Sequence, residues 1–215
     1  MLLEKDYCTM YIARHGETEA NVKKVSNGHL DSPLTEVGVS QAEELGRLLK
    51  NIKFEAAFSS DLNRAHHTAK IALLDRDLAI QTSKFLREKR MGYFEGKTYE
   101  EYGKAMKNII AQMKIVSASD RIKLKASYDE ESEEEACGRF ITFLREIAVA
   151  YLNKNIFIVS HGGAIRMLLT HLGFATREEL LGAVANTAYV KIKSDGVDFF
   201  IEETVGITKN IISNS

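Results

Sequence analysis

The sequence predicts a single α/β domain in three layers, with helices on both faces of a mostly parallel central sheet. Short apolar and β-branched runs alternate along the chain with longer segments of helical periodicity, a pattern typical of such sheets. The chain has 215 residues, 45% of them hydrophobic and 27% charged, which suits one domain with a sizeable core. Since no internal repeat divides it, we expect one domain over residues 1–215.

The first half of the chain predicts two strands, each followed by a helix. Tyr7–Ala13 is rich in aromatic and β-branched residues, and Phe54–Phe58 is a short apolar run, so both are predicted strands. Apolar residues within Val39–Leu49 recur on one helical face, with Thr35 as the predicted cap. After the second strand, Ser59-Ser60-Asp61 offers N-cap chemistry for another helix.

The middle of the chain predicts an edge strand, a loop and a helix. Residues 78–82 alternate in polarity and form the predicted edge strand, and residues 83–96 form the loop. Residues 98–116 carry an apolar stripe at helical spacing, and we expect this stripe to pack in the core. The stripe consists of Tyr99, Tyr102, Met106, Ile109, Ile110 and Met113.

The last third returns to alternating helices and strands. A long helix over Ser132–Leu152 starts with three glutamates, which suit the helix dipole. Asn155–Ser160 is a predicted buried strand, and His161–Leu172 a helix opened by two glycines. Two strands, near 187–193 and 197–204, close the chain around the turn Ser194-Asp195-Gly196.

Charge and composition exclude several classes of partner. The formal net charge is −1, with a pI near 6.6, so we expect neither nucleic acid nor an anionic membrane as a partner. The N-terminus lacks the apolar core of a signal peptide, and Cys8 and Cys137 lie in apolar stretches without metal-ligand spacing. We therefore expect a cytoplasmic protein with reduced thiols. No residue pattern indicates an oligomeric state.

Histidine and arginine follow predicted strands at three places. Arg14-His15-Gly16 ends the first strand, Arg64 lies one turn into the helix after the second, and His161 follows the strand 155–160. In open α/β sheets ligands bind beyond the carboxyl ends of the strands. We therefore expect two arginines and two histidines to converge there.

This set of side chains suits phosphoryl transfer. Arginine binds a phosphoryl group with its planar fork, and a neutral imidazole can attack phosphorus to give a labile N–P intermediate. Gly162-Gly163 leaves backbone N–H groups at a helix N-terminus, where phosphate oxygens bind readily. Glu88, in the loop 83–96, is the candidate general acid for the leaving alkoxide.

Four blocks of sequence resemble the histidine phosphatase superfamily, also called the phosphoglycerate mutase-like family. The first begins with Arg14-His15-Gly16-Glu17-Thr18, which is similar to that family's signature, and continues through Asp31–Glu36 and Gly38. The other three follow in the family's order, and they are Ser59–Ala65, Leu86–Glu88 with Glu95-Gly96, and Ser160–Gly163.

The resemblance implies a role for each site residue. His15 would be the nucleophile, Arg14, Arg64 and His161 would surround the phosphoryl group, and Glu88 would serve as acid and then base. The residues implied to bind substrate are Asn21, Gly162, Asn27 and Thr18. The implied fold is phosphoglycerate mutase-like, and the family needs no metal or other cofactor.

The resemblance leaves the substrate open. It implies a phosphatase acting on a small phosphorylated metabolite, and the alternatives are a phosphoglycerate mutase or an inactive binding member. It is thinnest over residues 97–128, where we expect a helical cap whose cations Arg121, Lys123 and Lys125 meet a second anionic group. Whether His29 reaches the site also stays open.

Overall fold

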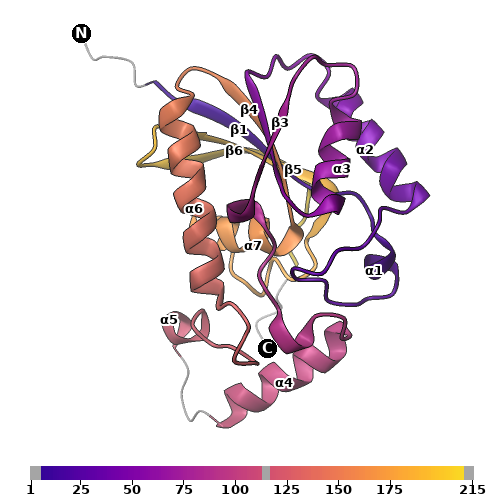
Figure 1. Ribbon diagram of the computed structural model, residues 1–215. Coiled ribbons are helices and arrows are strands. Elements are labelled where there is room, and N and C mark those ends of the chain that lie inside the picture. The colour runs from indigo at the N-terminus through magenta and orange to yellow at the C-terminus, as the bar shows by residue number, and fades with distance from the viewer. Residues whose placement is uncertain (1–5, 113–116, 211–215) are drawn as a thin grey trace.

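The computed structural model describes residues 6–112 and 117–210, and within them a six-stranded sheet lies at the centre, in the order β3-β2-β4-β1-β5-β6 (Figure 1). Neighbouring strands from β3 to β1 are parallel, whereas β5 is antiparallel to β1 and β6 to β5. The predicted mostly parallel sheet is therefore confirmed. The strands are β1 (Cys8–Arg14), β2 (Ala56–Ser60), β3 (Ile80–Ser83), β4 (Asn155–Ser160), β5 (Val184–Ser194) and β6 (Phe199–Ile207).

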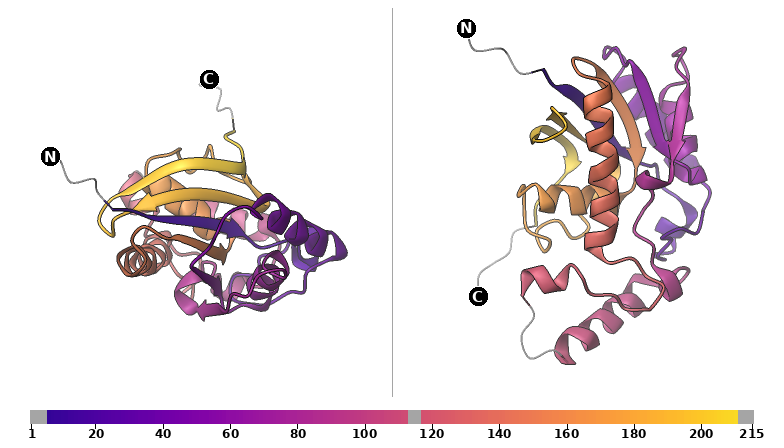
Figure 2. Two further views of the ribbon diagram at one scale, coloured as in Figure 1. Left: turned by 90° about the horizontal axis from the view of Figure 1, so that it is seen from above. Right: turned by 60° about the vertical axis from the view of Figure 1, so that its left-hand side comes forward.

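Helices cover both faces of the sheet, as Figures 1 and 2 show. α6 (Glu133–Ala150) and α7 (Gly162–His171) pack on one face, and α2 (Glu36–Leu48) and α3 (Asn63–Ala72) on the other. Successive residues of a strand point to opposite faces. In β1, Met10 and Ile12 accordingly join the core under α6 and α7, whereas Tyr11 joins the core under α2 and α3. The three-layer prediction is confirmed.

The predicted cap of α2 is confirmed, and the predicted cap of α3 is wrong. Thr35 Oγ1 accepts a 3.0 Å hydrogen bond from Gly38 N at the start of α2. At the start of α3, Leu62 occupies the N-cap position without a side-chain hydrogen bond. The Asp31 carboxylate instead accepts from the backbone N–H groups of Asn63 and Arg64, at 2.5 and 3.3 Å. A loop remote in sequence thus replaces the local cap.

α4 (Tyr99–Gln112) differs from its prediction, because none of its described residues is buried. The described residues of its apolar stripe do not pack in the core. α4 and the short α5 (Ala118–Arg121) lie away from the helical layers, beyond the end of the sheet (Figures 1 and 2). Residues 113–116 of the predicted helix lie outside the described residues. The remaining short helices are α1 (Glu19–Val22) and two 3-10 turns, Lys84–Leu86 and Gly92–Phe94.

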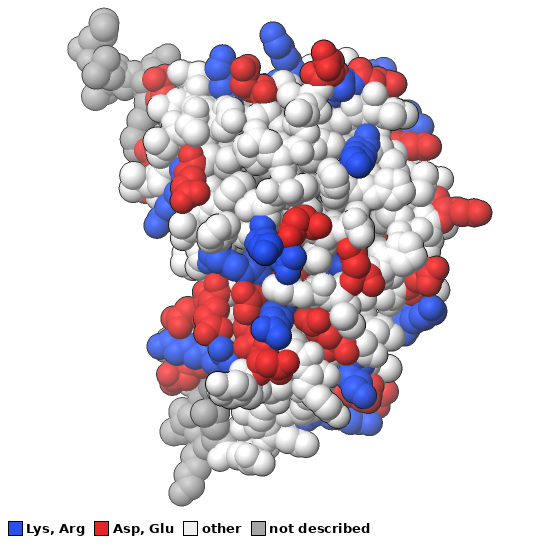
Figure 3. Space-filling model, in the orientation of Figure 1, with Lys and Arg blue, Asp and Glu red and all other residues white. Residues whose placement is uncertain are grey.

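The closing hairpin is longer than predicted. β5 extends beyond both of its predicted limits, whereas β6 begins later than predicted, at Phe199, and ends later, at Ile207. The turn between them forms as expected. Asp195 Oδ1 accepts hydrogen bonds from Val197 N and Asp198 N, at 2.9 and 2.8 Å, and Gly196 has a φ of +92°. On the face drawn in Figure 3, positive and negative side chains are interspersed. Among the described residues, no helix has the length and apolarity that a membrane span requires.

Candidate active site

Strand pairing brings His15 and His161 together. In the parallel pair β1 and β4, Arg14 lies opposite Ser160, so each strand delivers a histidine at the next position. His15 N donates a 3.0 Å hydrogen bond to Ser160 O, and the two ring centroids lie 5.2 Å apart at an interplanar angle of 65°. The predicted meeting of the two histidines at the carboxyl end of the sheet therefore occurs.

One ring nitrogen of His15 is already engaged. Nδ1 lies 2.7 Å from the backbone oxygen of Gly16, and because a carbonyl only accepts, this contact places the proton on Nδ1 of the neutral ring. The residue is 4% exposed, and burial, followed by the charges of Arg64 and Arg14, holds its pKa well below 6.5. The imidazole is therefore neutral near pH 7, with an unprotonated Nε2.

Both predicted arginines are held by backbone oxygens. Arg64 donates from Nη1 to Leu30 O at 2.7 Å and from Nη2 to Gly28 O at 2.8 Å. Arg14 donates from Nη1 to Val184 O at 2.7 Å. These bonds fix the planes of the two guanidinium groups beside His15.

Unpaired buried polar atoms gather at this site. Within the described part of the chain, six buried side-chain nitrogen or oxygen atoms have no hydrogen-bond partner in the protein. Four of the six are Nε of Arg14, Nε of Arg64 and both ring nitrogens of His161. An unpaired buried polar group costs about 1–3 kcal/mol, so such a concentration is typical of a site that binds a polar ligand.

Glu88 lies at the N-terminus of α7. Its Oε2 accepts a 2.9 Å hydrogen bond from Gly163 N, and its Oε1 accepts one of 2.9 Å from Lys89 N. A Cβ on residue 163 would lie 2.5 Å from Oε1, so this approach requires glycine. Gly163 N–H therefore binds the carboxylate rather than being open to phosphate as predicted, whereas Gly162 lines the cavity.

Arg139 of α6 holds the loop that carries Glu88. No sequence pattern predicted this role. Its Nη1 donates to Phe85 O and Arg87 O, at 2.8 and 2.9 Å, and its Nη2 donates to Glu88 O at 2.7 Å. The same guanidinium pairs with Glu131 through Nε and Nη2, at 2.8 and 2.9 Å. Arg139 lies 51 residues from Glu88, and no local pattern connects the two.

His29, left open by the sequence, lies at the edge of the same loop. Its Nε2 is 3.0 Å from Glu88 O, and it stands between Gly28 and Leu30, whose carbonyl oxygens hold Arg64. The loop that positions an arginine thus contacts the loop that carries the candidate acid.

Of the four predicted substrate-binding residues, three line the cavity and one does not. Asn21, Asn27 and Gly162 line the cavity, whereas Thr18 is fully buried and its hydroxyl caps α1 by accepting from Asn21 N at 3.3 Å. Thr18 thereby orients Asn21. Asn186, which sequence reasoning missed, donates from Nδ2 to Asn21 Oδ1 and to His15 O, both at 3.2 Å.

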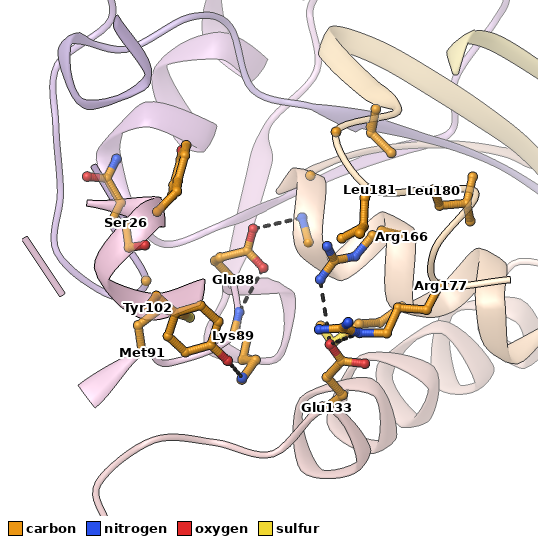
Figure 4. A pocket seen from close by; sticks show the side chains of 18 of the residues that line it. Ser26, Glu88, Lys89, Met91, Tyr102, Glu133, Arg166, Arg177, Leu180 and Leu181 are labelled. Atoms are coloured by element: carbon orange, nitrogen blue, oxygen red, sulfur yellow. Dashed lines mark hydrogen bonds and ion pairs between the residues drawn. The ribbon is translucent and has the colours of Figure 1, made fainter. Parts of the chain in front are cut away.

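A cavity of about 680 Å³ extends from His15 to α4 and α5. Its wall includes Tyr99, Tyr102, Met106 and Ile110 of the apolar stripe of α4, which explains why these residues are not in the core. A buried group connects this wall to the acid loop. Lys89 Nζ donates a 3.0 Å hydrogen bond to Tyr102 OH (Figure 4), and both also bind Glu130 Oε1. The apolar lining residues are Met91, Tyr99, Tyr102, Met106, Ile110, Met167, Leu180, Leu181, Ala183 and Val184.

Charged residues also line the cavity. Of the three cations predicted to face a second anion, Arg121 lines the cavity, Lys125 instead pairs with Glu135 at 2.6 Å, and Lys123 is exposed and is not part of the lining. Arg166 and Arg177 line the cavity together with Glu133. Within the described residues, no group of three or more His, Cys, Asp or Glu side chains is arranged to hold a metal ion.

Comparisons with known proteins agree with this geometry. The chain is 32% identical to the broad-specificity phosphatase YOR283W of Saccharomyces cerevisiae, over 94% of this chain and 86% of that protein. It is 31% identical to the adenosylcobalamin/alpha-ribazole phosphatase of Escherichia coli, over 76% and 78%. The fold matches a phosphoglycerate mutase structure from Bacillus anthracis with a TM-score of 0.79 and 26% identity, over 95% of each chain.

The family model of the histidine phosphatase superfamily (branch 1) matches residues 10–205, a stretch that contains all five predicted catalytic side chains. The resemblance seen in the four sequence blocks thus extends over nearly the whole chain, and this protein belongs to the histidine phosphatase superfamily, branch 1.

Proposed function

We propose that this protein is a metal-independent phosphatase that hydrolyses a small phosphorylated metabolite through a phosphohistidine on His15. One observation carries the proposal. A neutral imidazole with its proton fixed on Nδ1 stands among Arg14, Arg64 and His161, and Nε of each arginine and both ring nitrogens of His161 lack partners in the described structure. Such a group needs only a phosphoryl dianion to complete its hydrogen bonds.

In the first step, the lone pair of His15 Nε2 attacks phosphorus and the bond to the ester oxygen breaks. Arg14 and Arg64 stabilise the charge on the phosphoryl oxygens, as fixed cations do in other phosphoryl transfers. The departing alkoxide takes a proton from Glu88, which must enter this step protonated. His15 Nδ1–H remains bonded to Gly16 O and helps to disperse the positive charge of the ring.

In the second step, a water molecule attacks the phosphohistidine. Glu88, now a carboxylate, takes a proton from that water, and the N–P bond breaks to release inorganic phosphate and neutral His15. The N–H groups of Gly163 and Lys89 hold the two carboxylate oxygens while Glu88 is ionised. Glu88 thus alternates as acid and base within one turnover.

The size of the cavity supports a small-molecule substrate. A volume of about 680 Å³ is within the range of pockets that bind metabolites. We propose that α4 and α5, within the segment 97–128, form a cap over this cavity. We also propose that neither nucleic acid nor a membrane is a partner.

A mutase that returns the phosphoryl group to a sugar acid is the second candidate, because the fold matches that of a phosphoglycerate mutase from Bacillus anthracis. The two functions differ in the acceptor of the phosphoryl group. Turnover of a panel of phosphorylated metabolites, with inorganic phosphate and rearranged product measured separately, discriminates between them.

A labelling experiment tests the phosphohistidine. With ³²P-labelled substrate, protein-bound label should survive an alkaline quench and disappear after an acid quench, as expected of an N–P bond. His15→Ala should abolish both label and turnover, because loss of a nucleophile costs several orders of magnitude. Retention of more than about a hundredth of the activity would contradict the mechanism.

A further inference from the structure

The start of β5 is irregular where the strand approaches the active site. Five residue steps separate Val184 from Tyr189, whereas their partners in β6 are only two steps apart. β5 therefore contains a bulge between these two residues. Bulges are frequent beside active sites, where the extra residues redirect a side chain.

Thr187, within this bulge, has a left-handed backbone conformation. Its φ is +57°, and a β-branched side chain is strained in that region. Such strain persists only where the surrounding contacts impose it, and it is concentrated at functional sites. The backbone N of Thr187 donates a 3.4 Å hydrogen bond to His15 O, so the strained residue lies against the backbone of the proposed nucleophile.

The bulge contacts three residues of the site. Val184 O accepts a 2.7 Å hydrogen bond from Arg14 Nη1. Asn186 Nδ2 donates to His15 O and to Asn21 Oδ1, both at 3.2 Å. Arg14 and His15 come from the end of β1 and Asn21 from α1, so one short segment joins two parts of the site.

The hydrogen bonds of Asn21 determine which end of its amide is available to a ligand. Oδ1 lies 3.1 Å from Thr18 N, and because a backbone N–H only donates, this atom is the amide oxygen. The same oxygen accepts from Asn186. Asn21 Nδ2 has no acceptor among the described residues, and Asn21 lines the cavity. Its two N–H groups are therefore available to an oxygen of a bound phosphoryl group.

From this geometry we propose that Asn186 is a positioning residue, which holds the Asn21 amide with Nδ2 directed toward the phosphoryl group. The inference rests on the proposed phosphatase function and adds to its site a residue that does not itself line the cavity. Without Asn186, the Asn21 oxygen keeps a single hydrogen bond and the amide is free to turn. The strain at Thr187 is the cost of bringing the Asn186 side chain to this position.

A purely structural role for Asn186 makes a different prediction. If its hydrogen bonds only joined β5 to the segment after β1, replacing it would lower the melting temperature. Any accompanying loss of activity would then be independent of Asn21. Coupling between the two asparagines therefore separates the two roles, and thermal stability alone does not.

A double-mutant cycle of Asn186→Ala and Asn21→Ala measures this coupling. Each single substitution should lower kcat/KM for the best substrate of the metabolite panel about 10- to 100-fold. The double variant should stay within about 3-fold of Asn21→Ala, because Asn186 acts through Asn21. The matched control is Asn155→Ala, which removes a 3.1 Å hydrogen bond from Nδ2 to Lys53 O at the other end of the sheet. It should leave kcat/KM within about 2-fold of the wild type.

Two outcomes of the cycle would overturn the proposal. They are a double variant in which the two single losses multiply, and an Asn186→Ala variant that loses less than about 3-fold. Where Asn186→Ala does not fold, the wild type still decides. On titration with inorganic phosphate, the side-chain amide NMR signal of Asn21 should shift because its N–H groups gain an acceptor. An unchanged signal at saturation would contradict the role of Asn21 and with it that of Asn186.

Calorimetric binding of inorganic phosphate to the same proteins separates this inference from the proposed function. A non-additive cycle in phosphate affinity, with a wild type that hydrolyses no phosphomonoester, would refute the phosphatase and retain the role of Asn186. Turnover combined with an additive cycle would do the reverse. A wild type that neither binds phosphate nor hydrolyses its esters would refute both.

Discussion

Arg139 Nη2 donates a 2.7 Å hydrogen bond to the backbone oxygen of Glu88, so a helix on one face of the sheet holds the loop of the candidate acid. The other bonds of this guanidinium, to Phe85 O, Arg87 O and the Glu131 carboxylate, leave it little freedom. Since Arg139 contacts the backbone of Glu88 and not its carboxylate, we infer that it is a positioning residue.

Replacing Arg139 should therefore impair acid catalysis more than phosphoryl binding. Arg139→Gln should lower kcat for an alkyl phosphate about 10- to 100-fold, because a small displacement of a catalytic group lowers the rate by such a factor. Turnover of p-nitrophenyl phosphate should fall less than about 3-fold, because its leaving group hardly needs a proton. Arg145→Gln, on the exposed side of the same helix, is the control. Equal losses on both substrates would show that Arg139 only stabilises the fold.

Replacing Glu88 should produce the same difference between the two substrates, but a larger one. Glu88→Gln keeps the side-chain size but removes the transferable proton, and its amide can accept only one of the two backbone hydrogen bonds that Glu88 accepts. A general acid contributes about 10²- to 10⁴-fold. We expect a loss of that order for an alkyl phosphate and a much smaller one for p-nitrophenyl phosphate. Steady-state kinetics on the two substrates checks this, and an equal loss on both would exclude Glu88 from the acid role.

The two buried histidines make stability depend on pH. Burial, followed by the charge of Arg64, holds the pKa of His15 and of His161 well below 6.5. Below pH 6.5 the unfolded chain therefore binds protons that the folded protein does not, and the free energy of unfolding falls as the pH falls. Each histidine contributes up to about 1.4 kcal/mol per pH unit.

Urea denaturation between pH 5.0 and 7.5 measures this slope. His15→Gln should reduce it by up to about 1.4 kcal/mol per pH unit below pH 6.5, because one of the two proton uptakes is lost. His171→Gln replaces an exposed histidine at the end of α7 and should leave the slope as it is. A slope unchanged in His15→Gln would show that His15 protonates equally in both states.

Activity should survive chelation. In the proposed mechanism, the guanidinium groups of Arg14 and Arg64 supply the positive charge that a metal ion provides in other phosphatases. We expect EDTA to leave kcat/KM within about 2-fold of its initial value, with little gain from added Mg²⁺ or Zn²⁺. Loss of turnover in EDTA, restored by one specific ion, would be incompatible with the proposed mechanism.

Gly38 and Gly138 should respond oppositely to alanine. A Cβ on residue 38 would overlap the backbone oxygen of Glu17, just after His15, whereas a Cβ on residue 138 has no neighbour within 4 Å. Gly38→Ala should thus destabilise the protein and misplace the His15 loop, and Gly138→Ala should stabilise α6 by about 0.5–1 kcal/mol. Denaturation curves of both variants check this, and similar effects would contradict the close packing of α2 on that loop.

Site residues that come directly after a strand were predictable from the sequence. His15 and His161 stand directly after apolar runs, so strand pairing alone was sufficient to bring them together. The same reasoning failed for α4, whose apolar stripe at helical spacing is equally compatible with a core and with a cavity wall. Only the tertiary position of the helix decides between these two environments.

Contacts between distant segments were not predictable. Asp31 caps α3 in place of Ser59-Ser60-Asp61, because a loop folds over that helix end. Arg139 and Asn186 reach Glu88 and Asn21 across 51 and 165 residues, and no spacing encodes such pairs. Their polar side chains also resemble ordinary surface residues when only the sequence is considered.

The position of β1 between β4 and β5 has a consequence for synthesis on the ribosome. β1 emerges first, yet its earliest neighbour, β4, begins about 140 residues further along the chain. At a synthesis rate of about 5–20 residues per second, β1 has no neighbouring strand to pair with for roughly 7–28 s. The nascent chain can pair β2 with β3 in that interval but cannot bury β1, so we expect a chaperone that shields apolar segments to hold the N-terminal third until translation is nearly complete.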